Sequence, residues 1–406
     1  MKILSLFSAI VAAFLALTSL ENANAQGTWV TVTSILTPVA RSASAVLNGE
    51  LYVVGGEYSS GQYTDAVQVY NPVSNTWRVA HSLSHTSGEA AAASALGQLY
   101  VIGGLLGASS PSLKTVSIYD PLTDNWTTGS SMLIEKSNFV AAEVNGKIYA
   151  LGGYRPDNNA RIDDAEVYDP LQDQWMALPP LPGPRGNPAG AAVGDKIYVF
   201  GGDDATGTQT NTVFEFNTLN HKWTPKSPMP IARDSASAVV LNGLIYVMGG
   251  VTLVSVSPPA SMVDSRVDVY DPVADTWSAG VALPEPLARL ASGTIANSIY
   301  VTAGNFNSNK TYKSTAPAGP QSITDAISII QSQPSLTGGQ QNSLTSKLEG
   351  AQASIGSGNS NAACGQLGAF INEVNANRRS GRLDQSPATT LITFVATLRQ
   401  SLGCPP

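Results

Sequence analysis

Short apolar stretches alternate with glycine-containing and polar turns along most of the chain. Six of these stretches consist mainly of alanine, serine, glycine and valine, at residues 42–47, 90–96, 138–144, 188–193, 235–241 and 292–296. Tight turns follow, and three of them have the Asn-Gly dipeptide that accepts positive φ in a two-residue hairpin, at Asn48-Gly49, Asn145-Gly146 and Asn242-Gly243. A second apolar stretch comes after each turn. The pattern predicts hairpins of short strands, with the small side chains in an innermost strand where space is short.

Each second stretch ends in a glycine pair, and these pairs mark a repeat. They stand at Gly55-Gly56, Gly103-Gly104, Gly152-Gly153, Gly201-Gly202 and Gly249-Gly250, with a degraded sixth copy at Ala303-Gly304. An aromatic residue follows each of the first five pairs after a variable distance, at Tyr70, Tyr119, Tyr168, Phe216 and Tyr270. A tryptophan stands seven residues after each of these aromatics. The repeat therefore has a constant part and a variable part.

The constant part predicts two further strands in each unit. Asn71-Pro72 and Asp120-Pro121 directly follow the aromatic residue, and an Asx residue before proline is typical of a type I turn. The aromatic residue then closes a third strand and the tryptophan opens a fourth. A buried indole removes on the order of 150–250 Å² from water. We therefore interpret the six tryptophans as structural packing residues, at Trp29, Trp77, Trp126, Trp175, Trp223 and Trp277.

These residues resemble the kelch repeat, which combines a glycine pair, a separated tyrosine and a tryptophan in units of about 49 residues. The resemblance implies an all-β, six-bladed β-propeller over residues 26–317, with one four-stranded blade per repeat. Trp29 has no aromatic residue before it, yet like the others it lies 26 residues before the next glycine pair or its degraded copy. The strand around Trp29 is thus expected to complete the last blade, which closes the ring and leaves no free edge.

The first 25 residues have the pattern of a signal peptide. Lys2 precedes a mostly apolar run over residues 3–20, and Ala23-Asn24-Ala25 offers small residues at a cleavage site. A retained membrane anchor is the alternative, but the run is short and the polar Glu21-Asn22 precedes the cleavage site. We expect a secreted, periplasmic or cell-surface protein of the bacterial type, without a transmembrane segment in the mature chain.

After Tyr312 the strand pattern ends, and residues 318–406 are predicted to form a small all-α domain behind a linker. Helical spacing begins at Ile323 and continues over residues 340–355, 361–377 and 387–402. The apolar faces of these three helices contain Leu344, Leu348, Leu367, Phe370, Ile371, Val374, Leu391, Ile392, Val395 and Leu398. The chain has two cysteines, Cys364 and Cys404, and in an exported protein this even number predicts one disulfide between them.

The segments 342–352 and 362–374 of this domain resemble the FIMAH-type helical module found at the C-termini of secreted and cell-surface prokaryotic proteins. The resemblance implies attachment or assembly rather than catalysis. A cell-envelope component is therefore the partner expected for the C-terminal domain.

Candidate ligand-binding residues lie in the variable loops, which a rigid propeller presents on one face. They are Arg41, Glu57, Glu89, Tyr154, Arg155, Asp203, Asp204, Arg233 and Arg289. Each of them is, on the simpler interpretation, solvated surface. Arg41 and Arg289 both stand 14 residues before a glycine pair or its degraded copy, whereas Arg185 and Arg233 stand 16 residues before theirs. An arginine cluster around the channel mouth would suit a carboxylated or sulfated ligand.

The enzyme classes that the sequence supports are few. No nucleophile motif of the GxSxG type is present, and His81 and His85 lack further metal ligands, so we expect no metal site and no cofactor. Copper chemistry of the cysteine–tyrosine type is excluded because the propeller region contains no cysteine. Nucleic acid is not an expected partner, because the formal net charge of −7 repels phosphate backbones.

Two function classes follow. The first is a non-catalytic binding module that recognises a glycan or protein ligand through the variable-loop face. The alternative is a sugar isomerase similar to the exported six-bladed kelch proteins that act as sialic acid mutarotases. In that case Glu57, Glu89 or Asp203 would supply the acid and base groups.

Overall fold

The structure is a computed structural model that describes residues 28–108, 110–155, 160–256, 259–304, 308–315, 323–356, 359–402 and 404. The chain divides after Thr315 into a β unit and a helical unit, each of which is described by itself. The expected signal peptide, residues 1–25, lies outside the described residues.

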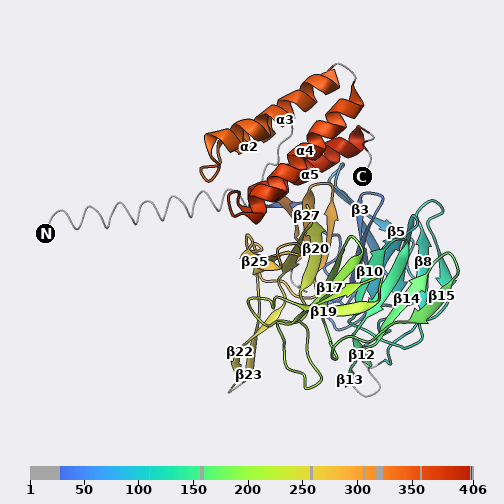
Figure 1. Cartoon of the computed structure of the whole chain (residues 1–406). Coiled ribbons are helices and arrows are strands. Elements are labelled where there is room, and N and C mark those ends of the chain that lie inside the picture. The colour runs from blue at the N-terminus through green and yellow to red at the C-terminus, as the bar shows by residue number, and fades with distance from the viewer. Residues whose placement is uncertain are drawn as a thin grey trace. The chain divides into compact units, whose positions relative to one another are not determined.

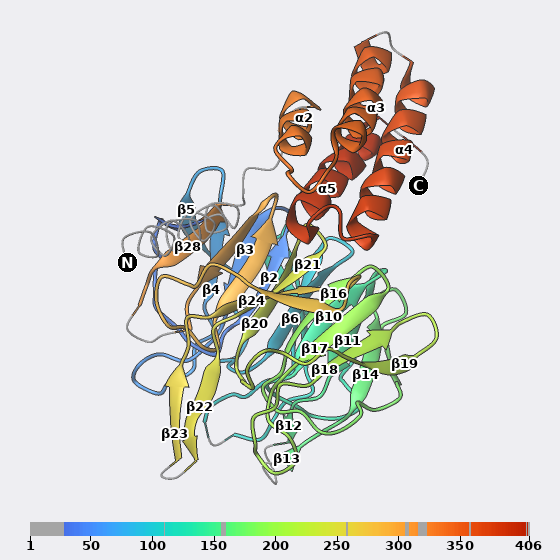
Figure 2. The same ribbon diagram turned by 60° about the vertical axis from the view of Figure 1, so that its left-hand side comes forward.

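The β unit contains six four-stranded antiparallel sheets, which Figures 1 and 2 show as successive blades. The first three blades consist of β2 (Ala43–Leu47), β3 (Glu50–Val54), β4 (Val67–Asn71) and β5 (Thr76–Ala80); β6 (Ala91–Ala95), β7 (Gln98–Ile102), β8 (Val116–Asp120) and β9 (Asn125–Gly129); and β10 (Val140–Val144), β11 (Lys147–Leu151), β14 (Ala165–Asp169) and β15 (Gln174–Ala177). The next two consist of β16 (Ala189–Val193), β17 (Lys196–Phe200), β18 (Val213–Asn217) and β19 (Lys222–Lys226); and β20 (Ser237–Leu241), β21 (Leu244–Met248), β24 (Val267–Asp271) and β25 (Thr276–Ala279).

The sixth blade joins the two ends of the β unit. Its strands are β26 (Ala291–Ile295), β27 (Ser298–Thr302), β28 (Thr311–Thr315) and, outermost, β1 (Thr28–Val32). Strand β1 pairs with β28 in antiparallel register, with Trp29 opposite Ser314. The inner strands contact one another in the closed order β2, β6, β10, β16, β20, β26 and back to β2. The expected fold class, a six-bladed β-propeller followed by a few helices, is confirmed.

Two short hairpins extend the variable segments that follow two of the glycine pairs. Strands β12 (Tyr154–Arg155) and β13 (Ala160–Arg161) pair in the third blade, and β22 (Val251–Val256) pairs with β23 (Pro259–Val263) in the fifth. Figure 2 shows the β22–β23 hairpin projecting from the blades.

The glycine pairs allow adjacent blades to approach closely. The second glycine of each pair donates its N–H to a carbonyl of the next blade, as Gly56 does to Ser87 O at 2.7 Å and Gly250 to Leu287 O at 2.8 Å. The first glycine leaves room for that carbonyl, because a Cβ on Gly55 would lie 2.1 Å from Ser87 O. Its φ of +63° also favours glycine. The glycine pairs that repeat in the sequence therefore mark the contacts between adjacent blades.

Each tryptophan also connects two blades. Its indole N–H donates to a backbone carbonyl of the neighbouring blade's connection, over 2.7–2.9 Å, from Trp29 to Val281, Trp77 to Thr33, Trp126 to His81, Trp175 to Ser130, Trp223 to Pro179 and Trp277 to Ser227. In three blades a nearby carboxylate accepts the tyrosine hydroxyl of its own blade and a backbone N–H of that same connection. Asp124 accepts from Tyr119 at 2.6 Å and from the N–H of His81 at 3.0 Å. Asp173 and Asp275 make the equivalent bonds, and Asn75 takes this place in the first blade.

We expect acidification to weaken these contacts. The tyrosine hydrogen bond lowers the pKa of Asp124 and of Asp173; at Asp275 burial opposes the shift, but the bond from Tyr270 still lowers its pKa. A lowered folded-state pKa adds stability above the unfolded value of about 3.9, and this stability is lost as pH falls through the folded pKa. The melting temperature should therefore fall below about pH 4.

The control is the triple variant Asp124→Asn, Asp173→Asn and Asp275→Asn, which keeps the acceptor oxygen as Asn75 does in the first blade. Its melting temperature should depend less on pH between about 2 and 5 than that of the parent. Parallel pH profiles of the two proteins would contradict this account.

The helical unit consists of α2 (Ile323–Gln331), α3 (Gly338–Gly356), α4 (Ser360–Arg379) and α5 (Gln385–Ser401). The α3, α4 and α5 residues fully buried in its core include Leu344, Leu348, Leu367, Phe370, Val374, Leu391 and Val395. A disulfide joins Cys364 in α4 to Cys404 beyond α5. Within the described residues, no helix has the length and apolar character needed to cross a membrane.

Candidate functional site

One residue from each blade contributes to a ring around the propeller axis. These residues lie 14 positions before each glycine pair or its degraded copy, where the chain enters the inner strand: Arg41, Glu89, Asn138, Asn187, Ser235 and Arg289. All six have φ between 49° and 58°, the left-handed region that non-glycine residues seldom adopt. Each N–H donates to the carbonyl of the preceding member, over 2.8–3.3 Å, and the N–H of Arg41 closes the circle on Arg289 O. This closed circle of hydrogen bonds holds the unusual conformation.

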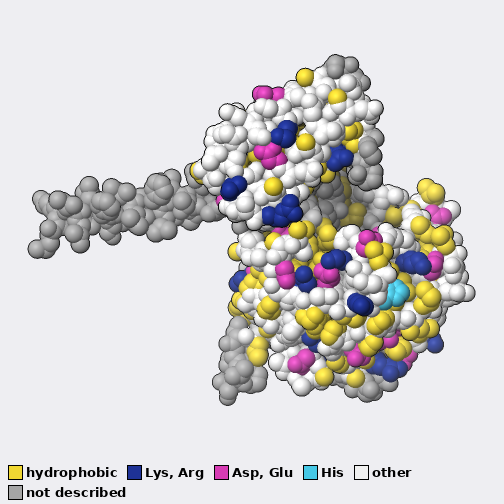
Figure 3. All heavy atoms as spheres, in the orientation of Figure 1, with side chains coloured by type: hydrophobic (Ala, Val, Ile, Leu, Met, Phe, Trp, Pro, Cys, Tyr) yellow, Lys and Arg dark blue, Asp and Glu magenta, His cyan; other side chains and the backbone are white. Residues whose placement is uncertain are grey.

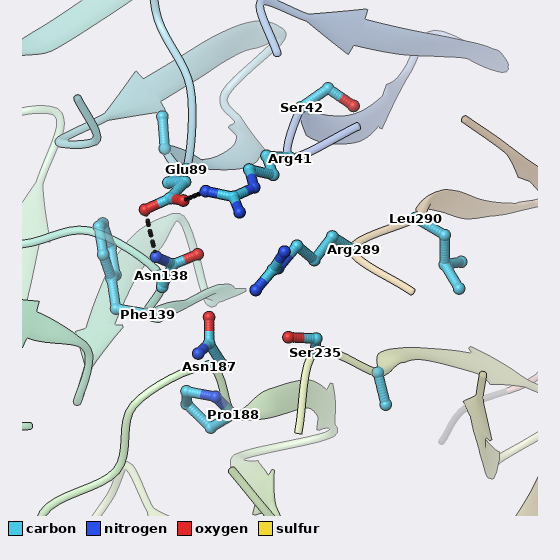
Figure 4. A pocket seen from close by; sticks show the side chains of 12 residues that line it. Arg41, Ser42, Glu89, Asn138, Phe139, Asn187, Pro188, Ser235, Arg289 and Leu290 are labelled. Carbon is cyan, nitrogen blue, oxygen red and sulfur yellow. Dashed lines mark hydrogen bonds and ion pairs between the residues drawn. The ribbon is translucent and has the colours of Figure 1, made fainter. Parts of the chain in front are cut away.

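The six ring residues surround a cavity of about 140 Å³. The residue after each of them completes the lining: Ser42, Ala90, Phe139, Pro188, Ala236 and Leu290. Figure 4 shows polar side chains of the ring residues directed toward the cavity. The other residues that line it are mostly small or apolar. Pockets for drug-sized ligands measure about 300–1,000 Å³. This cavity suits a small molecule or one chemical group of a larger ligand.

Arg41 is neutralised by two carboxylates. Its Nε lies 3.0 Å from Glu57 Oε2, and its Nη1 pairs with Glu89 Oε1. Burial alone would lower the pKa of Arg41, but Glu89 and Glu57 raise it above its usual range. Asn138 Nδ2 donates to the other oxygen of Glu89 at 2.5 Å. Of the expected acids, Glu89 lines the cavity and Glu57 supports Arg41 from behind it.

Arg289 has a different environment. Among the described residues, no carboxylate lies within ion-pair distance of its guanidinium, and its Nε is buried without a hydrogen-bond partner. Figure 4 shows this guanidinium extending into the cavity toward Asn138 and Asn187. A partly buried cation without a counterion is well placed to bind an anion. Arg289 is therefore the centre of positive charge in the pocket.

A second polar cluster supports Asn187. Asn187 Nδ2 donates to the hydroxyl of Tyr154 at 3.2 Å, and that hydroxyl donates to Asp203. Arg161 lies over the Tyr154 ring, 4.9 Å from its centroid, and 3.5 Å from Asp203 Oδ2. Burial raises the pKa of Asp203; the hydrogen bond from Tyr154 opposes this rise and the nearby Asp234 adds to it. Tyr154 and Asp203 thus act behind the pocket lining.

The remaining candidates lie away from the cavity. Arg155 pairs with Glu135 at 3.4 Å on the partly exposed β12 hairpin. Asp204 caps its own loop by accepting the N–H groups of Thr206 and Thr208 at 2.9 and 3.1 Å. Neither side chain lines the cavity.

The expected arginine cluster of four does not form. Arg233 is 1% exposed and pairs with the buried Asp268 at 2.9 Å, so it cannot reach the pocket. Arg185 is 6% exposed and lies 5.0 Å from the centroid of the Phe214 ring. The position 16 residues before the glycine pair therefore faces the space between blades, and the position 14 residues before it faces the axis.

The sequence interpretation missed Asn138, Asn187 and Ser235. The spacing of 14 residues that singled out Arg41 and Arg289 identifies them when it is applied to every repeat. Their uncharged side chains gave no chemical signal by themselves.

The repeats match known family models over most of the β unit. The model described as KLHDC2/KLHL20/DRC7 Kelch-repeats domain matches residues 138–317, and the Kelch motif matches residues 38–84 and 88–133. The propeller is a kelch-repeat domain. Together these matches cover nearly all of the kelch propeller that the structure describes.

A solved structure has a similar fold. The structure of YjhT superposes with a TM-score of 0.60 at 18% sequence identity, covering 69% of this chain and 95% of that one. At this identity the likeness concerns the fold of the kelch propeller alone. No curated protein sequence matches the chain.

Proposed function

We propose that the kelch propeller is a binding domain that takes an acidic group of a glycan or protein ligand into the pocket at its axis. The observation that supports this most directly is Arg289, whose guanidinium reaches the cavity without a carboxylate partner among the described residues. A bidentate hydrogen bond from arginine is the usual way in which proteins recognise carboxylates.

The attraction would be local to the pocket. The chain has a formal net charge of −7, and acidic and basic side chains are interspersed on the side of the propeller visible in Figure 3. Long-range steering would therefore not draw an acidic ligand to the protein. Affinity would depend on direct contact with Arg289, because Glu57 and Glu89 already neutralise Arg41.

The variant Arg289→Gln tests this proposal, because it removes the charge and keeps a long polar side chain. Loss of a charge-assisted hydrogen bond should weaken binding about 10- to 100-fold. The measurement is binding of the wild type and the variant to arrays that pair carboxylated glycans and acidic peptides with their uncharged counterparts. Arg155→Gln is the control, since it removes an arginine that does not line the pocket. Equal binding of charged and uncharged probes, or equal binding by Arg289→Gln, would reject the proposal.

The isomerase alternative retains one of its three proposed acids. Glu89 lines the cavity beside Arg41, whereas Glu57 lies behind Arg41 and Asp203 lies behind Tyr154. A sugar-opening reaction would need Glu89 as the group that moves a proton. NMR exchange spectroscopy of the two anomers of a carboxylated sugar distinguishes the functions. A binding protein leaves the exchange rate unchanged, while an isomerase accelerates it and loses the acceleration in Glu89→Gln.

The helical unit would attach the exported protein to a cell-envelope component. Its disulfide between Cys364 and Cys404 is compatible with an oxidising compartment. Cell fractionation of the full chain and of a shortened chain ending at Pro317 tests this role. The full chain should sediment with the envelope and the shortened chain should be released. Identical fractionation of the two would reject the attachment role.

A further inference from the structure

We propose that the pocket selects carboxylates that carry a hydrogen-bond donor, a hydroxyl or an ammonium group, on the neighbouring carbon. This inference rests on the proposed function and names the ligand class of the same site. It follows from the direction in which two amide side chains and one hydroxyl face the cavity.

The amide of Asn138 has a fixed orientation. Its Nδ2 donates to Glu89 Oε2 at 2.5 Å, and a carboxylate oxygen can only accept. The opposite end of the amide, the Oδ1 acceptor, therefore faces away from Glu89. Figure 4 shows this oxygen directed into the cavity.

The amide of Asn187 is fixed in a similar way by Tyr154. Since Asp203 accepts the tyrosine proton, the phenol oxygen is left as the acceptor for Asn187 Nδ2 at 3.2 Å. Asn187 Oδ1 consequently also faces the cavity, as Figure 4 shows. No donor among the described residues bonds Oδ1 of either asparagine.

Ser235 adds a third polar atom at the same place. Its side chain is 6% exposed, and its Oγ is buried without a hydrogen-bond partner. The cavity therefore combines one unpaired cation, Arg289, with two acceptor oxygens and a hydroxyl that can accept or donate.

This combination matches a particular ligand chemistry. A carboxylate can bind Arg289, but a ligand with acceptors only would leave the two amide oxygens desolvated and unpaired, which is unfavourable. A hydroxyl or ammonium group next to the carboxylate can donate to Asn138 or Asn187. A sulfate, whose oxygens only accept, would satisfy Arg289 and leave both amides without donors.

Three small acids of the same carbon skeleton test the proposal on the full chain: propionate, lactate and alanine. They differ only in the group next to the carboxylate, which is absent, a hydroxyl and an ammonium, respectively. Ligand-observed NMR titration should give a dissociation constant for lactate or alanine about 10-fold lower than for propionate, the effect of one added hydrogen bond. The preferred member of the pair identifies the donor as a hydroxyl or an ammonium group.

The variant Tyr154→Phe tests the positioning role of the tyrosine. It removes the acceptor that holds Asn187 Nδ2, so the amide can turn and the preference over propionate should shrink, while the affinity for propionate stays unchanged. Asn187→Gly is the second variant, because glycine tolerates the φ of 49° at this position. It should reduce the preference in the same way if Tyr154→Phe fails to fold.

The outcomes separate the two proposals. Equal affinity for propionate, lactate and alanine would overturn the donor preference and leave the carboxylate site standing. A preference that survives both Tyr154→Phe and Asn187→Gly would overturn the assigned role of Asn187 and Tyr154. Absence of binding for all three acids would overturn the proposed function together with this inference.

Discussion

Replacing Asp268 by leucine should lower the free energy of unfolding by about 3–5 kcal/mol, because it leaves a buried guanidinium without its carboxylate. Arg233 and Asp268 both have fully buried side chains and lie 2.9 Å apart, and burial lowers the pKa of Arg233. The other bond of this guanidinium goes to the carbonyl of Val247 at 3.0 Å. Removal of the carboxylate therefore leaves a fully buried guanidinium without its ion-pair partner, and the more distant Asp264 is the remaining anion that acts on it. Denaturant unfolding of the full chain measures the loss.

Two matched variants distinguish a lost ion pair from a cavity effect. Arg233→Met should cost less, because Arg266 still pairs with Asp268 through its Nε at 2.8 Å. The double variant Arg233→Met and Asp268→Leu should recover most of the stability that Asp268→Leu loses, since apolar replacement of a buried pair is often neutral or favourable. Additive losses in the double variant would contradict the explanation, because they would mean that the two side chains do not interact.

The variant Trp29→Ala should lower the melting temperature by about 6–20 °C. Truncation of a packed tryptophan costs about 3–5 kcal/mol, and each kcal/mol shifts the transition of a domain this large by about 2–4 °C. Trp29 lies on the strand that completes the sixth blade, and its indole N–H bonds Val281 O of the fifth blade at 2.9 Å. The substitution therefore weakens the sixth blade, the only blade of the described ring whose strands come from both ends of the β unit. Differential scanning calorimetry measures the shift.

Trp126→Ala is the matched control. It removes the equivalent indole–carbonyl bond from the second blade to the connection that follows the first, where all strands of the blade are continuous in the chain. Trp29→Ala should destabilise the protein at least as much, because β1 has no chain connection to the rest of its blade and depends on non-covalent contacts such as its pairing with β28 and this hydrogen bond. Superimposable melts of Trp29→Ala and the parent would exclude a role of this residue in closure.

The sequence predicted the fold well because the contacts between blades recur in it. A glycine without Cβ must stand where Ser87 O approaches Gly55, and an indole must stand where it can reach the neighbouring connection. The tryptophan recurs six times and the glycine pair five times, with Ala303-Gly304 as the sixth copy, at constant spacing, so both are visible in one sequence. The helices α3 to α5 were predicted from apolar spacing alone, and their leucine and phenylalanine positions form the core of the helical unit.

The site was predicted only in part, because candidate residues were chosen by their charge, whereas their position in the repeat decides whether they face the cavity. Arg41, Glu89 and Arg289 line the cavity, but Arg233 has the same side chain as Arg289 and lies two positions earlier in its repeat. Near the strand entrance this small shift turns a side chain from the axis into the interface between blades. The left-handed backbone of the ring residues leaves no signal in composition, since arginine, glutamate, asparagine and serine all adopt it here.

The circle of six hydrogen-bonded residues couples ligand binding in the pocket to the stability of the whole propeller. Each blade supplies one wall of the cavity, so any separation of neighbouring blades dismantles the binding surface. A molecule that binds there therefore stabilises the folded propeller by mass action. At a concentration one hundred times its dissociation constant, it raises the free energy of unfolding by about 2.7 kcal/mol. Thermal shift screening of small acids thus offers a direct route to the natural ligand.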